Sequence, residues 1–361
     1  MQMSLAAAAL ALVAAGCVQP PLPDSARPAA EAGPVLATNS VTPLAGEPRF
    51  SAIRQLTAGG QNAEAYFSRD GSWLTFQSAQ LEYPCDQQYV MRLDGSGLRR
   101  VSDGRGKTTC GWFFPDGKRL FFGSTTAHQD RCPPKPDPSS GYVWPLDPYD
   151  IYAADRDGSN VKRLTHYDVY TAEGVLSPDG QRIVFTSLES GDLEIYTMNV
   201  DGTDVRRLTH TPGYDGGPWW SPDGTKIVYR ANHPADSAGL AQYRALLSQN
   251  LVRPSRVELF IMNADGSDQR QITRLGGANF GPSWTPDGRR IIFSSNFRDP
   301  RSGNFDLFMI DQNGDGLEQI TTDPGFDGFP MFSPDGRKLI WASSRGASRS
   351  GETNLFLADW K

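Results

Sequence analysis

The sequence is poor in histidine, in cysteine and in excess positive charge. Its 361 residues include four His and four Cys, and its formal net charge is −6. A nucleic-acid surface needs clustered Lys and Arg to neutralise phosphates, so we expect no nucleic-acid partner. A G-x-S-x-G nucleophile elbow and a phosphate-binding loop are both missing from the sequence. We therefore expect no catalytic residue, no metal ion and no cofactor.

Long apolar runs are missing as well, apart from the first sixteen residues, which are too few to span a bilayer comfortably. This run ends in Ala14-Ala15-Gly16-Cys17, which resembles the lipobox of bacterial lipoproteins. We expect residues 1–17 to be a lipoprotein-type signal peptide and lipobox, with Cys17 lipidated. The resemblance implies an exported, periplasmic protein held at the outer membrane through this lipid alone. The alternative is an ordinary cleaved signal with an incidental Cys17.

Residues 18–48 contain seven prolines and no periodic apolar pattern, which predicts an extended tether.

From residue 49 to 361 the sequence repeats. A strand-turn-strand unit such as GVLSPDGQRIVFTS occurs six times. The turn glycines of the six units are Gly71, Gly117, Gly180, Gly224, Gly288 and Gly336. Three intervals of 44 to 48 residues fit a four-stranded blade, and two of 63 and 64 residues require insertions.

A second half-motif follows each unit: strand, D-G turn, strand, as in DLEIYTMNVDGTDVRRLT. Each repeat thus predicts four antiparallel strands. The last repeat ends at NLFLADWK without a fourth strand, and RFSAIRQLT begins the body as a fourth strand without a third. Pairing the two would remove open sheet edges. We therefore predict an all-β fold: a six-bladed β-propeller over residues 49–361, closed by an N-terminal strand that completes the last blade.

The SPDG and DGS/QLT signatures resemble the repeats of the TolB C-terminal propeller and of propellers attached to prolyl-oligopeptidase-type hydrolases. The chain departs from TolB in having a tether where TolB has an α/β domain, and it lacks the hydrolase nucleophile elbow. The resemblance implies a WD40-like propeller with a non-catalytic binding or scaffolding role in the cell envelope. We expect a monomer that binds a protein, peptide or glycan on its loop-rich face.

Both insertions, residues 125–149 and 231–257, connect second to third strands and so elaborate the same face. The second contains a short helical pattern with Leu240, Tyr243, Leu246 and Leu247. It is interpreted as a lid packed on the propeller, with a partner-binding helix as the alternative.

Aligning the repeats on the turn glycine places a ring of small or polar residues at the start of each innermost strand. This ring contains Asn62, Thr108, Thr171, Asp215, Asn279 and Asp327. Two residues further on lie Glu64, Cys110 and Glu173, then Gly217, Gly281 and Phe329. We expect these positions to surround the channel mouth. As ligand- or partner-binding residues we select Asn62, Glu64, Thr171, Glu173, Asp215, Asn279 and Asp327. The alternative is that they only hydrogen-bond neighbouring blades.

Three further interpretations stay open. An envelope hydrolase or lyase, with or without a metal ion, would use carboxylates at the channel mouth such as Glu64 and Glu173. Residues 311–316 resemble the start of a calcium loop but align with the hairpin turns of other blades. His166 and His210 follow equivalent strands and could form a metal site with Asp168 and Asp215.

Besides Cys17, the chain has Cys85, Cys110 and Cys132, all predicted on the elaborated face. Export makes a disulfide plausible. Cys85–Cys132 is slightly preferred because both residues fall in connections between second and third strands.

Overall fold

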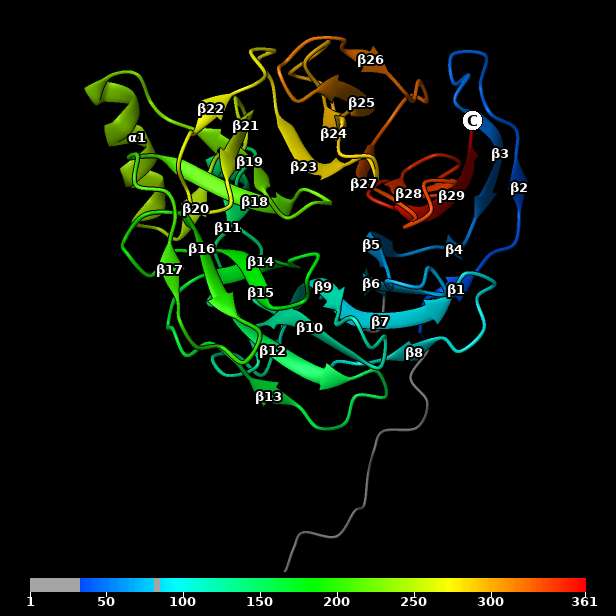
Figure 1. Ribbon diagram of the computed structural model, residues 1–361, viewed down its shortest axis with the longest axis horizontal. Coiled ribbons are helices and arrows are strands. Elements are labelled where there is room, and N and C mark those ends of the chain that lie inside the picture. Colours follow the sequence, from blue (N-terminus) through cyan, green and yellow to red (C-terminus); the bar gives the residue numbers. More distant parts are fainter. Residues whose placement is uncertain (1–32, 81–84) are drawn as a thin grey trace, which may run out of the picture. The chain divides into compact units, whose positions relative to one another are not determined.

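The computed structural model describes residues 33–80 and 85–361, so Cys17 and the expected signal peptide lie outside the described residues. Residues 33–361 form one compact unit. Six antiparallel sheets are arranged around a central axis (Figure 1). In the described part of the chain, no helix is long and apolar enough to cross a bilayer.

The first three blades each contain four strands in chain order from the axis outward. Blade 1 contains β5 (Gln61–Phe67), β6 (Trp73–Ala79), β7 (Gln87–Arg92) and β8 (Arg99–Arg100). Blade 2 contains β9 (Thr108–Phe113), β10 (Arg119–Ser124), β12 (Asp150–Asp155) and β13 (Lys162–Arg163). Blade 3 contains β14 (Thr171–Leu176), β15 (Arg182–Ser187), β16 (Glu194–Asn199) and β17 (Arg206–Arg207).

The next two blades follow the same order, and the last one closes the ring. Blade 4 contains β18 (Tyr214–Trp220), β19 (Lys226–Asn232), β21 (Glu258–Asn263) and β22 (Arg270–Gln271). Blade 5 contains β23 (Asn279–Trp284), β24 (Arg290–Ser295), β25 (Asp306–Asp311) and β26 (Glu318–Gln319). Blade 6 contains β27 (Asp327–Phe332), β28 (Lys338–Ser343), β29 (Asn354–Trp360) and β3 (Phe50–Gln55).

The predicted closure is confirmed, because β3 pairs with β29 and aligns Gln55 with Phe356. A fifth strand, β2 (Ser40–Val41), extends this sheet, and β1 (Val35–Leu36) pairs with β4 (Thr57–Ala58). The predicted tether therefore ends too late: residues 33–48 belong to the compact unit. Buried Glu47 explains part of this difference, because it forms an ion pair with buried Arg345 at an Oε1–Nη2 distance of 2.5 Å.

The PDG turns are built as the sequence predicts. In blade 3 the Gly180 N–H donates to the Ser177 carbonyl at 2.8 Å, and Gly180 has a φ of 74°, which glycine adopts without a Cβ clash. The Asp179 carboxylate accepts from the Gln181 N–H at 3.0 Å and so fixes the turn.

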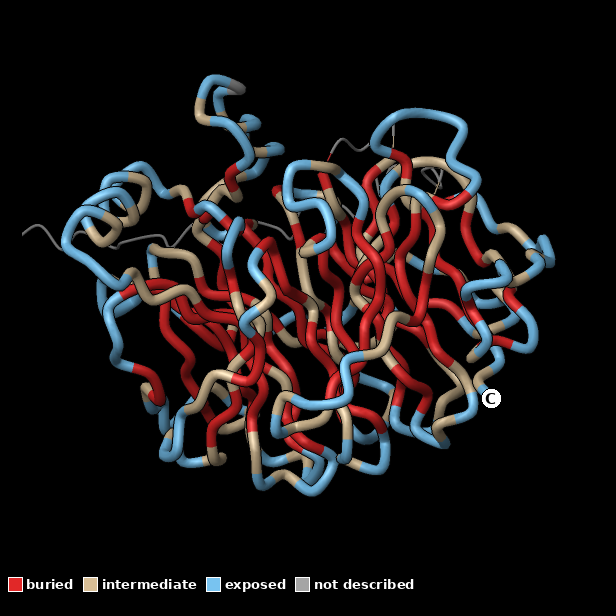
Figure 2. Tube along the Cα trace, turned by 90° about the horizontal axis from the view of Figure 1, so that it is seen from above, coloured by how far each residue is buried: buried red, intermediate tan, exposed pale blue. Residues whose placement is uncertain are grey.

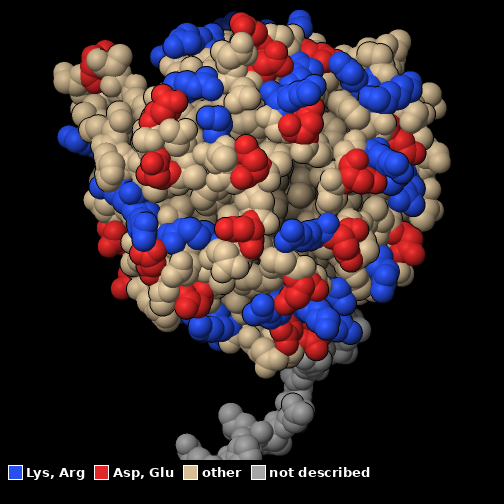
Figure 3. All heavy atoms as spheres, viewed as in Figure 1, with Lys and Arg blue, Asp and Glu red and all other residues tan. Residues whose placement is uncertain are grey.

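The hydrophobic core lies between neighbouring blades. Ile292 and Leu307 of blade 5 pack with Leu339 and Trp341 of blade 6 in one buried cluster. In a view turned by 90°, buried strands lie between two rims of exposed loops (Figure 2). Lys and Arg alternate with Asp and Glu over the face drawn in Figure 3, and neither sign forms one broad patch there.

A candidate ligand-binding cup on the propeller axis

Each innermost strand carries the same β-bulge. The pairing of the first two strands of each blade shifts register there, for example between Ala63 and Tyr66 in blade 1. The bulged residue has left-handed backbone in all six blades. We call these residues the bulge ring: Glu64 (φ 52°), Cys110 (50°), Glu173 (60°), Gly217 (57°), Gly281 (59°) and Phe329 (56°). Left-handed backbone costs a non-glycine residue about 1–2 kcal/mol, and a bulge redirects its side chain.

All six residues of the bulge ring line one cavity of about 230 Å³, which we call the axial cup. Tyr66 and Trp219 also line the axial cup, and both pack with Trp112. The ring centroids lie 5.3 Å apart for Tyr66–Trp219, 5.4 Å for Tyr66–Trp112 and 4.8 Å for Trp112–Trp219. These three rings come from blades 1, 2 and 4, and we call them the aromatic floor: Tyr66 and Trp219 line the axial cup, and Trp112 packs against both.

The two insertions meet over the axial cup. β11 (Trp144–Pro145) of the first insertion pairs with β20 (Leu251–Val252) of the second. The Leu146 N–H also donates to the Asn250 carbonyl at 2.8 Å. The roof, as we call residues 144–146 with Val252, lines the axial cup. The sequence placed both insertions on one face but did not predict that they pair.

The predicted helix exists as α1 (Ser237–Leu247), which begins after the N-cap Asp236. Its Tyr243 and Leu247 pack against a buried cluster, and the Tyr243 hydroxyl donates to Asp192 at 2.5 Å. No residue of α1 is among those that line the axial cup. The insertion therefore covers the cup with β20 rather than with its helix. The first insertion also contains the short 3-10 helix Pro138–Ser140.

Glu173 is held as a carboxylate. It forms an ion pair with buried Arg230 and accepts hydrogen bonds from Thr186 Oγ1 at 2.7 Å and from the Gly217 N–H at 2.8 Å. Burial acts to raise the pKa of Glu173, but the Arg230 charge and these hydrogen bonds outweigh it and lower the pKa. Arg230 also donates from Nε to the Tyr214 hydroxyl at 2.7 Å.

The pKa of Glu64, in contrast to that of Glu173, is raised by its surroundings. Its side chain accepts from the Tyr66 hydroxyl at 3.3 Å and contacts the Cys110 thiol. Burial raises the pKa of Glu64 to about 7, and the nearby negative charge of Glu173 adds to this rise. The pKa values of two carboxyl groups in one cavity are therefore shifted in opposite directions.

Further aromatic side chains line the axial cup. Tyr149, Tyr170 and Tyr214 lie along its sides, together with Phe329 of the bulge ring. Lys107 lines it as well, and its Nζ lies 3.6 Å from Asp147 Oδ2. An apolar cavity with a few convergent polar groups is typical of a small-ligand site.

Of the seven residues predicted to bind, Glu64 and Glu173 line the axial cup. The other five are Asn62, Thr171, Asp215, Asn279 and Asp327, and none of them is among the residues that line the axial cup. They are 0–1% exposed, as is Thr108 at the aligned position. Their side chains hydrogen-bond within or beside their blade, as Asn279 does with Ser295 Oγ at 2.6 Å. The bulge lies beyond these positions, so the following residues are redirected instead.

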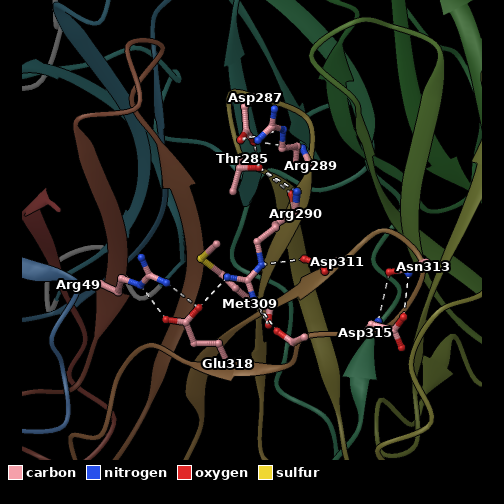
Figure 4. Close-up of polar contacts among 11 residues, drawn as sticks. Arg49, Thr285, Asp287, Arg289, Arg290, Met309, Asp311, Asn313, Asp315 and Glu318 are labelled. Atoms are coloured by element: carbon pink, nitrogen blue, oxygen red, sulfur yellow. Dashed lines mark hydrogen bonds and ion pairs between the residues drawn. The ribbon is translucent and has the colours of Figure 1, made fainter.

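The metal interpretations find no support in the geometry. Among residues 33–80 and 85–361 no group of three or more His, Cys, Asp or Glu side chains converges. His166 and His210 are exposed, and Asp215 instead contacts His233 at 3.0 Å. The calcium-like segment is a hairpin turn, in which the Gly314 N–H donates to the Asp311 carbonyl at 2.9 Å. Figure 4 shows Asp311 directed at Arg290, which also contacts Glu318 beside Arg49.

Cys85 and Cys132 form a disulfide with a Cα–Cα distance of 5.5 Å, which is the preferred pairing. It connects the β6–β7 loop of blade 1 to the first insertion. Cys110 is free and lies in the bulge ring.

The aromatic floor was not predicted from the sequence. Tyr66, Trp112 and Trp219 occupy the same aligned position, four residues after the small or polar ring, so the alignment contained this signal. Arg230 had no comparable signal, because nothing in its strand distinguishes it from other basic strand residues.

Comparison with known proteins agrees with the fold. Residues 150–250 match a family model described as the TolB beta propeller domain. TolB from Acinetobacter baumannii superposes with a TM-score of 0.56 at 17% identity, covering 77% of this chain and 61% of that one. The chain thus carries a propeller of the TolB type, as the repeats predicted.

Other similar proteins are enzymes. A gluconolactonase from Xanthomonas campestris superposes with a TM-score of 0.58 at 16% identity, covering 92% of this chain and 98% of that one. An oligogalacturonate lyase in complex with manganese superposes with a TM-score of 0.53 at 14% identity, covering 91% of this chain and 97% of that one. A dipeptidyl-peptidase 5 from Porphyromonas gingivalis is 49% identical over 39 residues, which is 11% of this chain and 6% of the relative. At these identities the structural likeness establishes the fold alone.

Proposed function

We propose that this protein is a non-catalytic binding propeller of the bacterial cell envelope that holds the end of a peptide or glycan chain in the axial cup. The observation that carries the proposal is the cup itself. It has an aromatic floor, a wall made by the bulge ring of every blade, and a roof supplied by the two longest insertions. Convergence of three independent parts of the chain on one cavity favours a ligand there.

The charges of the axial cup support binding over turnover. Glu173 is engaged by Arg230, Thr186 and Gly217, which suits a fixed structural charge. The disulfide Cys85–Cys132 supports the envelope part of the proposal, because such bonds persist in oxidising compartments. We further propose that the protein is monomeric and reaches its membrane through a lipid on Cys17.

The test fills the axial cup without changing its charges. Phe329 already adopts at φ 56° the conformation that Gly281 has at φ 59° in the preceding blade. Gly281→Phe should therefore fold, with a strain of about 1–2 kcal/mol, and project a ring into the cavity. A panel of dipeptides, monosaccharides and small amines is screened by ligand-observed NMR. We expect hits on the unmodified protein that are lost in Gly281→Phe.

The matched control is Gly276→Ala, which carries similar strain at φ 73°, has open space around it and lies outside the axial cup. It should retain every hit. Ligands that bind Gly281→Phe as well as the unmodified protein would place the site elsewhere and refute the proposal, as would a panel without hits.

One observation favours a second candidate, an envelope hydrolase or lyase. Glu64, with a pKa of about 7, could act as a general acid while the ionised Glu173 acts as a base. Chromogenic glycosides and aminoacyl anilides test this candidate. Turnover that disappears in Glu64→Gln, at unchanged melting temperature, would replace the binding proposal with an enzymatic one.

A further inference from the structure

We propose that the axial cup selects a ligand with a primary ammonium group on a small apolar body, with Glu64 receiving the ammonium. This inference rests on the proposed function and specifies the chemistry of its ligand. It follows from the balance of charges in the cavity, from the nature of its walls and from its size.

The first step is the balance of charges. Glu173 is neutralised by Arg230, and Lys107 lies beside Asp147. Glu64 is the remaining acid that lines the axial cup, and its contacts are the neutral Tyr66 hydroxyl and Cys110 thiol. No Lys or Arg of the described chain lies within ion-pair distance of it. A buried carboxyl without a cationic partner is stabilised in its charged form by a cation supplied from outside.

The second step is the wall. Tyr66, Tyr149, Tyr170 and Trp219 all line the same cavity as Glu64. The faces of such rings carry negative partial charge and attract ammonium groups. A carboxylate ligand would instead meet the ionised Glu64 as a like charge, whereas the charge of Glu173 is already matched by Arg230. Wall and charge therefore favour the same sign of ligand.

The third step is size. An apolar cavity of about 150 Å³ holds one benzene molecule. The axial cup, at about 230 Å³, therefore has room for a benzene-sized body together with a short ammonium-bearing arm. This size matches the end of a chain or a small free amine and excludes a whole folded partner.

Ionisation of Glu64 gives the proposal a pH signature. The charged and titratable groups that act on Glu64 are Cys110 of β9, Glu173 of β14, Arg230 of β19 and Asp86 of the β6–β7 loop. Of these, Asp86 titrates nearby, because burial raises its pKa to about 6. With a pKa of about 7, the ionised fraction of Glu64 rises about tenfold between pH 6 and pH 8.

The experiment uses benzylamine as the probe and benzyl alcohol as its neutral counterpart of the same shape. Binding to the full chain is measured by isothermal titration calorimetry at pH 6 and pH 8. We expect benzylamine affinity to rise about tenfold across this range, and benzyl alcohol to bind more weakly without this rise. Equal affinity of the two probes at pH 8, or no binding of benzylamine, would overturn the proposal.

Glu64→Gln should weaken benzylamine at least tenfold at pH 8 and abolish its pH dependence, whereas Glu189→Gln, an exposed glutamate, should change neither. Melting temperatures establish that both variants are folded, and the pH series on the unmodified protein needs no variant. If neutral ligands bind, are lost in Gly281→Phe and outcompete benzylamine, the ammonium selectivity fails while the axial cup remains the binding site.

Discussion

The small or polar ring and the bulge ring lie on the same six strands, two residues apart, yet the structure uses them differently. Members of the first ring are 0–1% exposed and bond to their own or adjacent strands. Members of the bulge ring line the axial cup. The first ring varies only among Asn, Thr and Asp, whereas the bulge ring contains Glu, Cys, Gly and Phe. The fold thus fixes side chains in the first ring and only the backbone in the second, which leaves the bulge ring free to carry function.

The largest loss of stability is expected for a substitution in the small or polar ring. Asn279 donates to the Val257 carbonyl at 2.8 Å and accepts from Ser295 Oγ at 2.6 Å, with no exposure to solvent. Asn279→Ala removes both of these side-chain bonds from a site without solvent and should lower the free energy of unfolding by about 2–4 kcal/mol. Urea denaturation measures this loss. Ligand binding by the folded fraction should persist, and its selective loss would break the distinction between the two rings.

An intermediate effect should appear in the pH dependence of stability. Burial raises the pKa of Asp306 to about 7, with a further contribution from Asp327 of the first ring. The folded state therefore holds the proton more tightly than the unfolded state, whose Asp pKa is about 4. This contribution to stability is complete below pH 4 and is lost as the pH rises through about 7.

Asp306→Asn should remove this part of the pH dependence, on the order of 1–2 kcal/mol between pH 5 and pH 8. Asp287→Asn is the control, because hydrogen bonding from Thr285 lowers the pKa of Asp287, so this residue is ionised throughout the range in both states. Guanidinium denaturation at several pH values gives the slope of the unfolding free energy against pH for each variant. Identical slopes for the two variants would contradict the assignment.

The smallest change in stability is expected for a substitution in the bulge ring. Cys110→Gly removes left-handed strain at φ 50° but also removes the thiol contact with Glu64, so stability should change by less than about 1 kcal/mol. The neighbouring Thr109→Gly, without such strain, should be destabilising by about 1 kcal/mol. Thermal unfolding compares the two. A large loss for Cys110→Gly would show that the fold constrains this side chain as well.

Much of the architecture could be predicted because it is local and repeated. The Pro-Asp-Gly turns and D-G hairpins specify strands through backbone preferences of single residues, and six copies specify the blades. Packing of residues 33–48 could not be predicted in this way. It depends on single long-range contacts such as Glu47–Arg345, which leave no periodic pattern.

The candidate site was partly predictable for the same reason. Glu64 and Glu173 were found because the repeat alignment shows which residues of different blades occupy the same position of the innermost strand. Tyr66, Trp112 and Trp219 could have been found in the same way. The alignment could not show which way each side chain points, because the bulge breaks the simple alternation of a strand. Pairing of β11 with β20 joins segments about 100 residues apart and has no signature in either.

That pairing makes the two insertions mutually dependent. Each contributes a two-residue strand that would lack a hydrogen-bonding partner alone, and they emerge from blades 2 and 4, on either side of blade 3. Shortening one would leave the other without its partner strand. Leu146 and Val252 also pack in one buried cluster with Leu193 and Tyr214 of the propeller. A change of ligand specificity through the roof therefore has to preserve both the strand pairing and this packing.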